Sequence, residues 1–538
     1  MLFLQLIFAA KDIEFFEWTG DVLAVAVTEK DLSKDTDFRF ENALLNKLDG
    51  QLGGLLSAAA AEEDFAGTAG QSVVLRLQGH GFKRVALIGF AGHSAVSLQG
   101  LGESVAAVAR AVQAGSAAVV LSSASVIQEE LKLNAAAAIA TGTVLGLYED
   151  FRYKSEWKNV HLKQLHLIGL GSGPEVDQKL EYANHISSGV IFGRDLVNSP
   201  ANVLTPAVLA EEASKIASAY SDVLTATILD AEKCRELKMG AYLAVAAASA
   251  NPPRFIHLCY KPKDGNVKRK LAIIGKGLTF DRNHKKVDAY NFVEVPLVVW
   301  FLYILESPVL SGGYNIKTGP IARIELMKWD MGGSAAALGA AKALGQIKPP
   351  GVEVHFIAAS CENMISGTGM RPGDVVTASN GKTIEVDNTD AEGRLTLADA
   401  LVYACNQGVD KIIDLATLTG AVRVALGPNI AGILTPSDEL AQEFVVASQV
   451  SGEKFWRLPI EESYWESMSS GVADMLNTGP MYPKAGVITA ALFLKQFVNE
   501  KVQWMHIDMA GTVWNHKKRS ATGFGVATLV EWVLKNSR

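Results

Sequence analysis

The sequence is poor in cysteine. Its 538 residues include only four cysteines, and no two of them have Cys-x-x-Cys spacing: Cys234, Cys259, Cys361 and Cys405. Cysteines scattered in this way argue against a disulfide framework and against a zinc site made of thiolates. We therefore expect a protein of a reducing environment whose four thiols fill the core.

The sequence also lacks an excess of positive charge. It has 50 Lys and Arg against 57 Asp and Glu, a formal net charge of −7 at pH 7. Proteins that bind nucleic acid through their overall field are basic, so we expect no nucleic-acid partner. The hydrophobic fraction of 49% is typical of a globular protein with a large core, and the length allows two or three domains.

Long apolar runs are missing as well. The apolar residues 296–305 and the apolar start at residues 1–10 are both far shorter than the about 20 residues needed to span a bilayer. No positive charge precedes the apolar start, and no Ser- and Arg-rich leader is present. We expect no membrane partner and a cytoplasmic location, with a plastid as the alternative if a transit peptide is missing from this chain.

The hydrophobic pattern predicts an α/β protein. Residues 83–90 and 117–121 are short apolar runs typical of buried strands, and residues 100–113 form an Ala-rich helical pattern. Such alternation favours a sheet covered by helices. Helical periodicity continues from 174 to 198 and ends at the two prolines of Asn198–Pro206. We therefore expect an N-terminal α/β domain at 1–175, a linker helix at 176–200 and a larger C-terminal domain at 201–538.

Four further apolar runs predict strands of the C-terminal domain: 271–274, 352–357, 411–415 and 502–507. Each runs into a turn that contains glycine or acidic residues, and open α/β sheets bind ligands at their strand ends. Functional residues should therefore gather there. His355 and His506 lie inside apolar strands and are interpreted as core histidines rather than metal ligands, and the other histidines form no metal-binding spacing.

The most informative run is Asn-Thr-Asp-Ala-Glu-Gly-Arg-Leu at 388–395. Asp390, Glu392 and Arg394 stand at alternate positions, while Gly393 and the helical pattern after it predict a turn at the end of a strand. Carboxylates are hard ligands for cations, and a guanidinium binds anions through a rigid fork. Taken alone the run fits a charged surface turn, so its interpretation as a metal site depends on the rest of the chain.

Three other runs support a metal site: Gly-Lys-Gly-Leu-Thr-Phe-Asp at 275–281, Ser-Gly-Gly-Tyr-Asn-Ile-Lys at 311–317 and Leu-Met-Lys-Trp-Asp-Met-Gly-Gly-Ser at 326–334. Two divalent ions close together polarise a carbonyl and lower the pKa of a bridging water. Several carboxylates offset their charge, and Zn²⁺ or Mn²⁺ accepts oxygen and nitrogen alike. Lys276 would have to lose its proton to bind such an ion. A solvated lysine or a phosphate-binding loop at Lys276 would leave the acidic runs downstream unexplained.

Together these four runs resemble the leucyl aminopeptidase family, also called the cytosol aminopeptidases, in its plant-type branch. The resemblance extends, with interruptions, over nearly the whole chain from about Lys11. It implies two α/β domains, each a mixed, largely parallel sheet flanked by helices, of which the larger C-terminal domain carries a di-metal site. It also implies release of N-terminal, preferably leucine-like apolar residues from peptides by metal-activated water, in a homohexamer.

The resemblance assigns the metal ligands residue by residue. It implies that Asp281, Asp390 and Glu392 hold one metal ion, and that Lys276, Asp281, Asp330 and Glu392 hold the other. Asp281 and Glu392 would therefore bridge two divalent ions, Zn²⁺, Mn²⁺ or both.

The resemblance also implies the catalytic and substrate-binding residues. Lys317 would polarise the scissile carbonyl, and Arg394 would hold a bicarbonate that acts as general base. Lys317, Asp330, Thr417 and Leu418 would contact the substrate.

The chain departs from the family pattern beside Asp281. Relatives continue directly into the segment that matches Ser311, whereas here 282–310 intervene, with basic and apolar stretches. We interpret this insert as a translated intron or gene-model error in preference to a functional insertion. A second departure is the proline-containing segment 477–487. Two functions therefore stay open: an aminopeptidase, and a catalytically impaired homologue that acts as an oligomeric binding or chaperone-like protein.

Overall fold

The computed structural model describes residues 6–37, 39–123, 128–156, 161–282, 324–479 and 485–537. Lys317, residues 283–310 of the insert and residues 480–484 lie outside this part of the chain. The chain divides into two compact units, Met1–Ile191 with Gln449–Gly452 and Phe192–Ser448 with Glu453–Arg538. Helix α5 (Pro174–Asn198) contains the point of division. The predicted domain bounds, with a linker helix at 176–200, stay a prediction.

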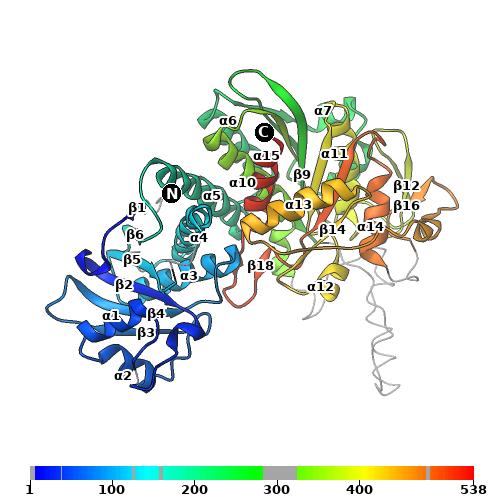
Figure 1. Cartoon of the computed structure of the whole chain (residues 1–538). Coiled ribbons are helices and arrows are strands. Elements are labelled where there is room, and N and C mark those ends of the chain that lie inside the picture. The colour runs from blue at the N-terminus through cyan, green and yellow to red at the C-terminus, as the bar shows by residue number, and fades with distance from the viewer. Residues whose placement is uncertain are drawn as a thin grey trace, which may run out of the picture. The chain divides into compact units, whose positions relative to one another are not determined.

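The first unit is built on a six-stranded sheet with the order β1-β6-β5-β2-β4-β3 (Figure 1). All neighbouring strands are parallel except β3 and β4, which are antiparallel. The strands are β1 (Ile7–Lys11), β2 (Gly20–Val27), β3 (Ser72–Arg76), β4 (Phe82–Gly89), β5 (Ser116–Leu121) and β6 (Gln164–Ile168). The other helices are η1 (Phe15–Glu17), η2 (Glu29–Leu32), α1 (Ala43–Gln51), α2 (Leu55–Glu62), α3 (Ala95–Ala111) and α4 (Glu129–Leu147).

Strand β2 shows why this sheet is covered on both faces. Successive side chains of a strand point to opposite faces. Val22, Ala24 and Ala26 belong to a core cluster with α3 and α4, whereas Leu23 and Val25 belong to a second cluster with α1 and α2. Both sets are buried. The strands expected at 83–90 and 117–121, and the helix expected at 100–113, are present in this unit with shifted ends.

The second unit contains an eight-stranded sheet with the order β15-β14-β17-β13-β9-β10-β8-β7. Its strands are β7 (Leu224–Leu229), β8 (Arg254–Tyr260), β9 (Val267–Asp281), β10 (Gly351–Asn363), β13 (Lys411–Ala416), β14 (Ala431–Leu434), β15 (Phe455–Arg457) and β17 (Gln503–Asp508). The central pairs β17–β13, β13–β9 and β9–β10 are parallel, and β10–β8, β8–β7 and β14–β17 are antiparallel. The fold class predicted from the sequence, two α/β domains with mixed, largely parallel sheets, is confirmed.

Helices cover this sheet, and two small sheets complete the unit. The helices are α6 (Pro206–Ala219), α7 (Ala231–Glu236), α8 (Gly240–Ala246), η6 (Ile324–Trp329), α10 (Gly332–Ile347), α11 (Glu392–Cys405), α12 (Gly420–Leu426), α13 (Asp438–Ser451), η7 (Glu462–Met468), α14 (Gly486–Lys495) and α15 (Val526–Asn536). The small sheets pair β11 (Asp374–Thr377), β12 (Thr383–Val386) and β16 (Met475–Leu476), and β18 (Trp514–Asn515) with β19 (Ser520–Ala521).

Strand β9 is longer than the sequence predicts. It was expected to end at 274 and to be followed by a turn, but it pairs with β10 as far as Asp281. Lys276 therefore lies inside a strand, so its expected place in a turn is wrong, and Asp281, which the predicted strand did not reach, ends β9. The strand continues through Gly275 because helix α10 packs directly on its backbone: a Cβ at Gly275 would lie 2.3 Å from the Ser334 backbone nitrogen.

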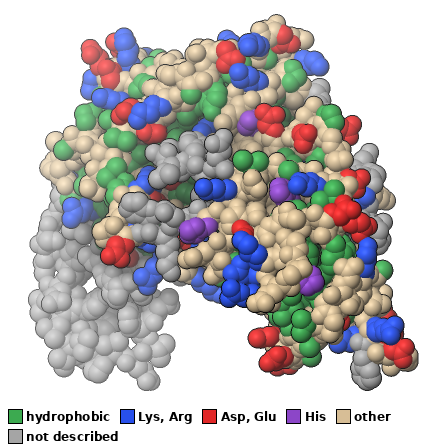
Figure 2. All heavy atoms as spheres, turned by 90° about the vertical axis from the view of Figure 1, so that its left-hand side faces the viewer, with side chains coloured by type: hydrophobic (Ala, Val, Ile, Leu, Met, Phe, Trp, Pro, Cys, Tyr) green, Lys and Arg blue, Asp and Glu red, His purple; other side chains and the backbone are tan. Residues whose placement is uncertain are grey.

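The surface mixes charges of both signs. On the described part of the face in Figure 2, basic and acidic side chains are interspersed. Nucleic-acid sites gather basic charge on one face, and the exclusion of a nucleic-acid partner stays a prediction. None of the helices in the described ranges is long and apolar enough to cross a bilayer.

Candidate metal centre and active site

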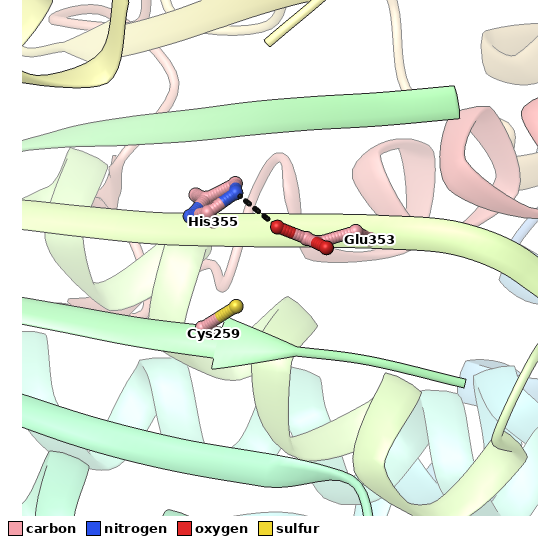
Figure 3. Close-up of side chains that lie close together, drawn as sticks. All are labelled: Cys259, Glu353 and His355. Carbon is pink, nitrogen blue, oxygen red and sulfur yellow. Dashed lines mark hydrogen bonds and ion pairs between the residues drawn. The ribbon is translucent and has the colours of Figure 1, made fainter. Parts of the chain in front are cut away.

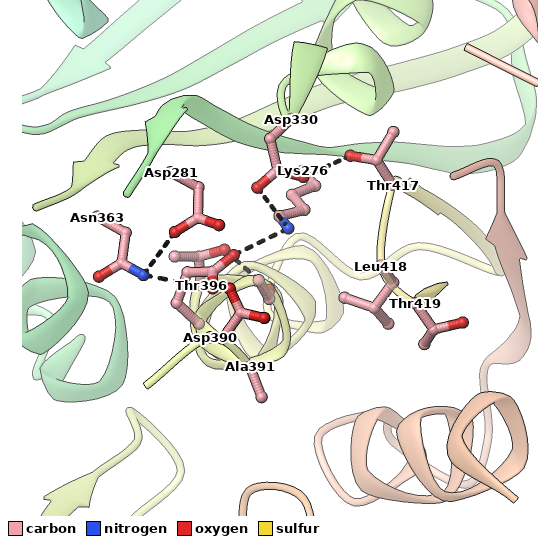
Figure 4. A network of polar contacts seen from close by, with 12 residues as sticks. Lys276, Asp281, Asp330, Asn363, Asp390, Ala391, Thr396, Thr417, Leu418 and Thr419 are labelled. Atoms are coloured by element: carbon pink, nitrogen blue, oxygen red, sulfur yellow. Dashed lines mark hydrogen bonds and ion pairs between the residues drawn. The ribbon is translucent and has the colours of Figure 1, made fainter. Parts of the chain in front are cut away.

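Three buried carboxylates converge at the end of β9, and Figure 4 labels two of them, Asp281 and Asp330. Asp281 ends β9, Asp330 follows η6, and Glu392 begins α11. One oxygen from each lies within 4.8 Å of the others, and the residues are 3%, 5% and 1% exposed. Buried anions this close repel one another and need compensating positive charge. The sequence-predicted ligands Asp281, Asp330 and Glu392 are therefore brought together in a group that suits a cation.

Lys276 reaches this group from the interior of β9. Its Nζ lies 2.8 Å from Asp330 Oδ2 and 2.9 Å from Glu392 Oε1. Burial alone would lower the pKa of Lys276, but the charges of Asp330, Glu392 and Asp281 outweigh burial and raise it. Lys276 is therefore an ammonium ion in this arrangement and contacts two carboxylates. From the same position, its deprotonated amine can join these carboxylates around a metal ion.

Asp390 lies on the turn between β12 and α11, two residues before Glu392 (Figure 4). The Asn388 side chain shapes this turn, because its Oδ1 accepts a hydrogen bond from the Asp390 backbone N–H at 3.0 Å. The turn expected from the sequence is present, although α11 begins at Glu392, before the helical pattern that follows Gly393 in the sequence. Asp390 is outside the group of three carboxylates found among the described residues, so its role as a ligand stays a prediction.

Arg394 lies on the first turn of α11 and is 6% exposed. Its Nη1 donates to the Asn477 carbonyl oxygen at 2.6 Å, while its buried Nε has no hydrogen-bond partner among the described residues. Burial lowers the pKa of Arg394 to about 10, against the opposing charges of Asp387 and Glu392. A buried guanidinium with an unmet N–H donor suits an anion that accepts a hydrogen bond.

The loop that follows β13 places Thr417 and Leu418 beside the carboxylates (Figure 4). Thr417 Oγ1 donates to Asp330 Oδ1 at 2.7 Å. The Leu418 backbone N–H donates to Asp508 Oδ1 at 3.2 Å, and Thr419 Oγ1 donates to Asp508 Oδ2 at 2.6 Å. Two carboxylates, those of Asp330 and Asp508, thus hold the loop.

Asn363 is a site residue that the sequence interpretation missed. It ends β10, where it pairs with Asp281 in register. Its Nδ2 donates to Asp281 Oδ1 at 2.9 Å and lies 3.3 Å from Glu392 Oε2. A polar residue that fixes two ligand carboxylates sets their orientation. In the sequence, the signal that could have identified Asn363 was its position shortly after the predicted strand 352–357.

Asn477 was also missed, since only the structure brings it to the turn before α11. Its Oδ1 accepts from the backbone N–H groups of Asp387 and Asn388, at 3.0 and 3.2 Å. Its Nδ2 donates to the Asn388 carbonyl oxygen at 2.7 Å. Because its own carbonyl also accepts from Arg394, one asparagine holds both the acidic turn and the guanidinium.

Gly393 is required by the position of Lys276. A Cβ at residue 393 would lie 2.5 Å from Cε and 2.7 Å from Nζ of Lys276. Real Cβ atoms do not approach heavy atoms so closely. Any side chain at this position therefore displaces the lysine amine from Asp330 and Glu392.

We expect Gly393→Ala to lower activity about 100-fold, because displacement of a catalytic group by about 1 Å costs this much. Gly100→Ala is the matched control: residue 100 is also helical, and a Cβ there meets nothing within 4 Å. Steady-state kinetics of both purified variants would check this. Equal activity of the two variants would contradict the requirement for an unobstructed Lys276.

The buried carboxylates with a lysine among them form a group that suits divalent cations. Comparison with known proteins identifies the family. A model of the cytosol aminopeptidase family, catalytic domain, matches residues 191–282 and 310–530, and a model of its N-terminal domain matches residues 24–157. The chain therefore belongs to the cytosol aminopeptidase family.

Close relatives match nearly the whole of this chain. The chain is 74% identical over 536 residues to leucine aminopeptidase 2, chloroplastic, of Oryza sativa subsp. japonica, covering 99% of this chain and 84% of the relative. It is 66% identical over 532 residues to leucine aminopeptidase 1 of Arabidopsis thaliana, covering 98% and 96%. The solved structure of a mutant of tomato leucine aminopeptidase is similar with a TM-score of 0.88 and 58% identity, covering 99% of this chain and 97% of that one.

These findings confirm the predicted family, and with it the class of enzyme, an aminopeptidase of a metal-dependent family. They also bear on the predicted insert. The catalytic-domain model matches up to residue 282 and resumes at 310, so residues 283–309 have no counterpart in it. The roles assigned to individual site residues remain predictions.

Proposed function

We propose that this chain removes N-terminal, preferably leucine-like apolar residues from peptides with two divalent metal ions. The observation that carries the proposal is the convergence of Asp281, Asp330 and Glu392 around Lys276, in a chain whose family consists of aminopeptidases. When bound, the two ions supply Lewis acidity toward the scissile carbonyl and activate water. Oxygen donors together with one amine favour Zn²⁺, Mn²⁺ or both.

We propose the metal ligands that the family resemblance implies. Asp281, Asp390 and Glu392 would hold one ion, and Lys276, with Asp281, Asp330 and Glu392, would hold the other. The contacts of Lys276 with Asp330 and Glu392 support its part in this set. Asn363 and Thr417 orient the carboxylates by donating hydrogen bonds to Asp281 and Asp330.

The remaining residues act on the substrate and on its protons. Arg394 would hold a bicarbonate as general base, and its buried Nε, which has no partner in the described part of the chain, supports that role. Thr417 and Leu418 would line the pocket for the apolar side chain, and Asp330 would contact the substrate beside its metal ion. Lys317, which lies outside the described residues, would polarise the scissile carbonyl.

Assembly and location are part of the same proposal. The family resemblance implies a homohexamer, which sedimentation of the purified chain would test. The sequence predicts the cytoplasm, and the rice relative's name places that protein in the chloroplast. Fractionation of cells that express the natural transcript would decide between the two compartments.

Hydrolysis of a leucyl amide tests the proposed activity. We expect turnover with added Mn²⁺, its loss when a chelator removes the metal, and its return when Mn²⁺ is restored. Activity that survives complete metal removal would contradict a di-metal mechanism.

A second function is favoured by the insert. Residues 283–309 have no counterpart in the family model and follow Asp281 almost directly. A catalytically impaired homologue that acts as an oligomeric binding or chaperone-like protein would bind metal and assemble, but fail to hydrolyse the amide. Prevention of aggregation of a heat-denatured client protein is the assay that this alternative requires.

Deletion of residues 282–310 separates the two functions. A carboxylate in a catalytic site must be held within about 0.5 Å, and the deletion restores the short connection from Asp281 to Ser311. We expect a sharp rise in turnover of the leucyl amide, together with better solubility because an apolar stretch is removed. If instead the deletion variant loses activity that the full chain possesses, the insert is functional.

A further inference from the structure

A second group of metal-binding side chains lies away from the active site (Figure 3). Cys259 belongs to β8, and Glu353 and His355 belong to β10. One ligand atom of each lies within 4.8 Å of the others. His355 pairs in register with Ala272 of β9, four residues before Lys276, which is about 13 Å along the strand. The group is therefore distinct from the carboxylates of the active site.

The register of β8 and β10 brings the group together. His355 lies directly opposite Cys259 in this antiparallel pair, so both side chains project from the same face. Glu353, two residues before His355, shares that face. In Figure 3 the Cys259 sulfur points toward the strand that carries the other two residues. Three ligand types thus converge from two rigid strands rather than from a mobile loop.

The donor set selects the kind of ion. A thiolate sulfur, an imidazole nitrogen and a carboxylate oxygen are the three ligand types of protein-bound Zn²⁺. Mg²⁺ and Ca²⁺ take oxygen ligands almost exclusively and do not favour sulfur or nitrogen. A thiolate and a carboxylate together also balance the charge of one divalent cation. The Cys259 thiol gives up its proton to solvent when the sulfur–metal bond forms.

His355 has the support that a metal-bound histidine requires. Its Nδ1 lies 2.9 Å from His257 Nε2, and His257 Nδ1 lies 3.1 Å from the Tyr403 hydroxyl. With its Nδ1–H donated to His257, His355 can direct the lone pair of Nε2 at an ion in place of its present contact with Glu353. Such a hydrogen bond on the other ring nitrogen fixes the tautomer of a ligand histidine.

Two nearby lysines compete with a metal ion for the Glu353 carboxylate, but they do not block the site. Lys261 Nζ and Lys270 Nζ lie 3.6 and 3.8 Å from the Glu353 carboxylate, and His355 Nε2 lies 3.0 Å from its Oε1. Both lysine side chains are largely exposed, at 64% and 42%, so each can turn away from Glu353 into water. Cys259 is half-buried, which leaves it accessible from solvent.

We propose that Cys259, Glu353 and His355 form a second metal site for a borderline divalent cation such as Zn²⁺, with His257 and Tyr403 as its supporting residues. The proposal departs from the sequence interpretation, which treated His355 as a core histidine and the cysteines as core fillers. Sequence spacing did not show the site, because Cys259 lies 94 and 96 residues before Glu353 and His355 and meets them only through strand register.

Titration of the metal-depleted full chain with Co²⁺ tests this proposal. A thiolate bound to Co²⁺ has a charge-transfer absorption in the near ultraviolet, whereas the proposed active-site ligands include no sulfur. We expect this absorption to saturate at one Co²⁺ per chain and to disappear when Zn²⁺ is added. A titration without the absorption would overturn the proposal.

Two cysteine variants test which thiolate produces the absorption. Cys259→Ser should abolish it and leave hydrolysis of a leucyl amide unchanged. The matched control is Cys405→Ser, at another half-buried thiol, and it should retain the absorption. His355→Gln should weaken Co²⁺ binding at least about 10-fold. Absorption that persists in Cys259→Ser, or is lost in Cys405→Ser, would place the thiolate elsewhere and overturn the proposal.

Discussion

Glu392→Gln is expected to abolish hydrolysis and to lower the metal content of the chain. Glu392 has 1% exposure, and its carboxylate contacts Lys276 and Asn363. The amide keeps the shape of the side chain but removes one negative charge from the proposed site, where the carboxylates would offset the charge of two dications. The loss should exceed the about 10- to 100-fold that removal of a ligand's hydrogen-bond partner causes. Asp390→Asn should have the same effect if Asp390 is a ligand.

Glu362→Gln provides the matched control for this experiment. Glu362 is also a buried carboxylate, at 6% exposure, but its oxygens accept hydrogen bonds from Ser249 and Asn251. We expect this variant to retain metal and activity. Elemental analysis beside leucyl amide kinetics measures both quantities, and full metal occupancy with normal turnover in Glu392→Gln would remove Glu392 from the metal site.

Arg394→Ala should separate metal binding from turnover. Arg394 contacts Asn477, its Nε has no partner within the ranges that the structure describes, and it is not one of the proposed ligands. If it holds the general base, the metals should remain while turnover falls about 10²- to 10⁴-fold, the usual contribution of a general base. Added bicarbonate should not restore the rate fully, because the group that binds it is gone.

Arg394→Lys is the matched variant for this prediction. It keeps a positive charge but loses the planar fork that binds an anion through two hydrogen bonds. We expect it to recover only part of the lost turnover. An unchanged rate in Arg394→Ala, measured at equal metal content, would exclude Arg394 from the mechanism.

The sequence predicted those features that depend on local pattern. Apolar runs such as 411–415 identified the buried strands, and the acidic run 388–395 identified the turn before α11. The runs that contain Lys276, Asp281 and Asp330 indicated the site because they resemble those of a known family. Their convergence in the structure supports that interpretation.

Features that depend on strand pairing were not predicted. Asn363 meets Asp281 because β10 runs beside β9, and Asn477 meets Asn388 across about 90 residues of chain. The position of Lys276 inside β9 has the same origin. The apolar run ends at 274, and the strand continues beyond it through pairing with β10. Pairing between distant strands leaves no periodic signal in the sequence of either partner.

The most direct test of the account is the cleavage of a leucine-initiated peptide, followed by mass spectrometry with and without an acetylated N-terminus. The full chain with Mn²⁺ should remove the N-terminal leucine from the free peptide and leave the acetylated peptide intact. A free peptide that stays uncleaved under these conditions, or that is cut at an internal bond, would contradict the proposed aminopeptidase activity.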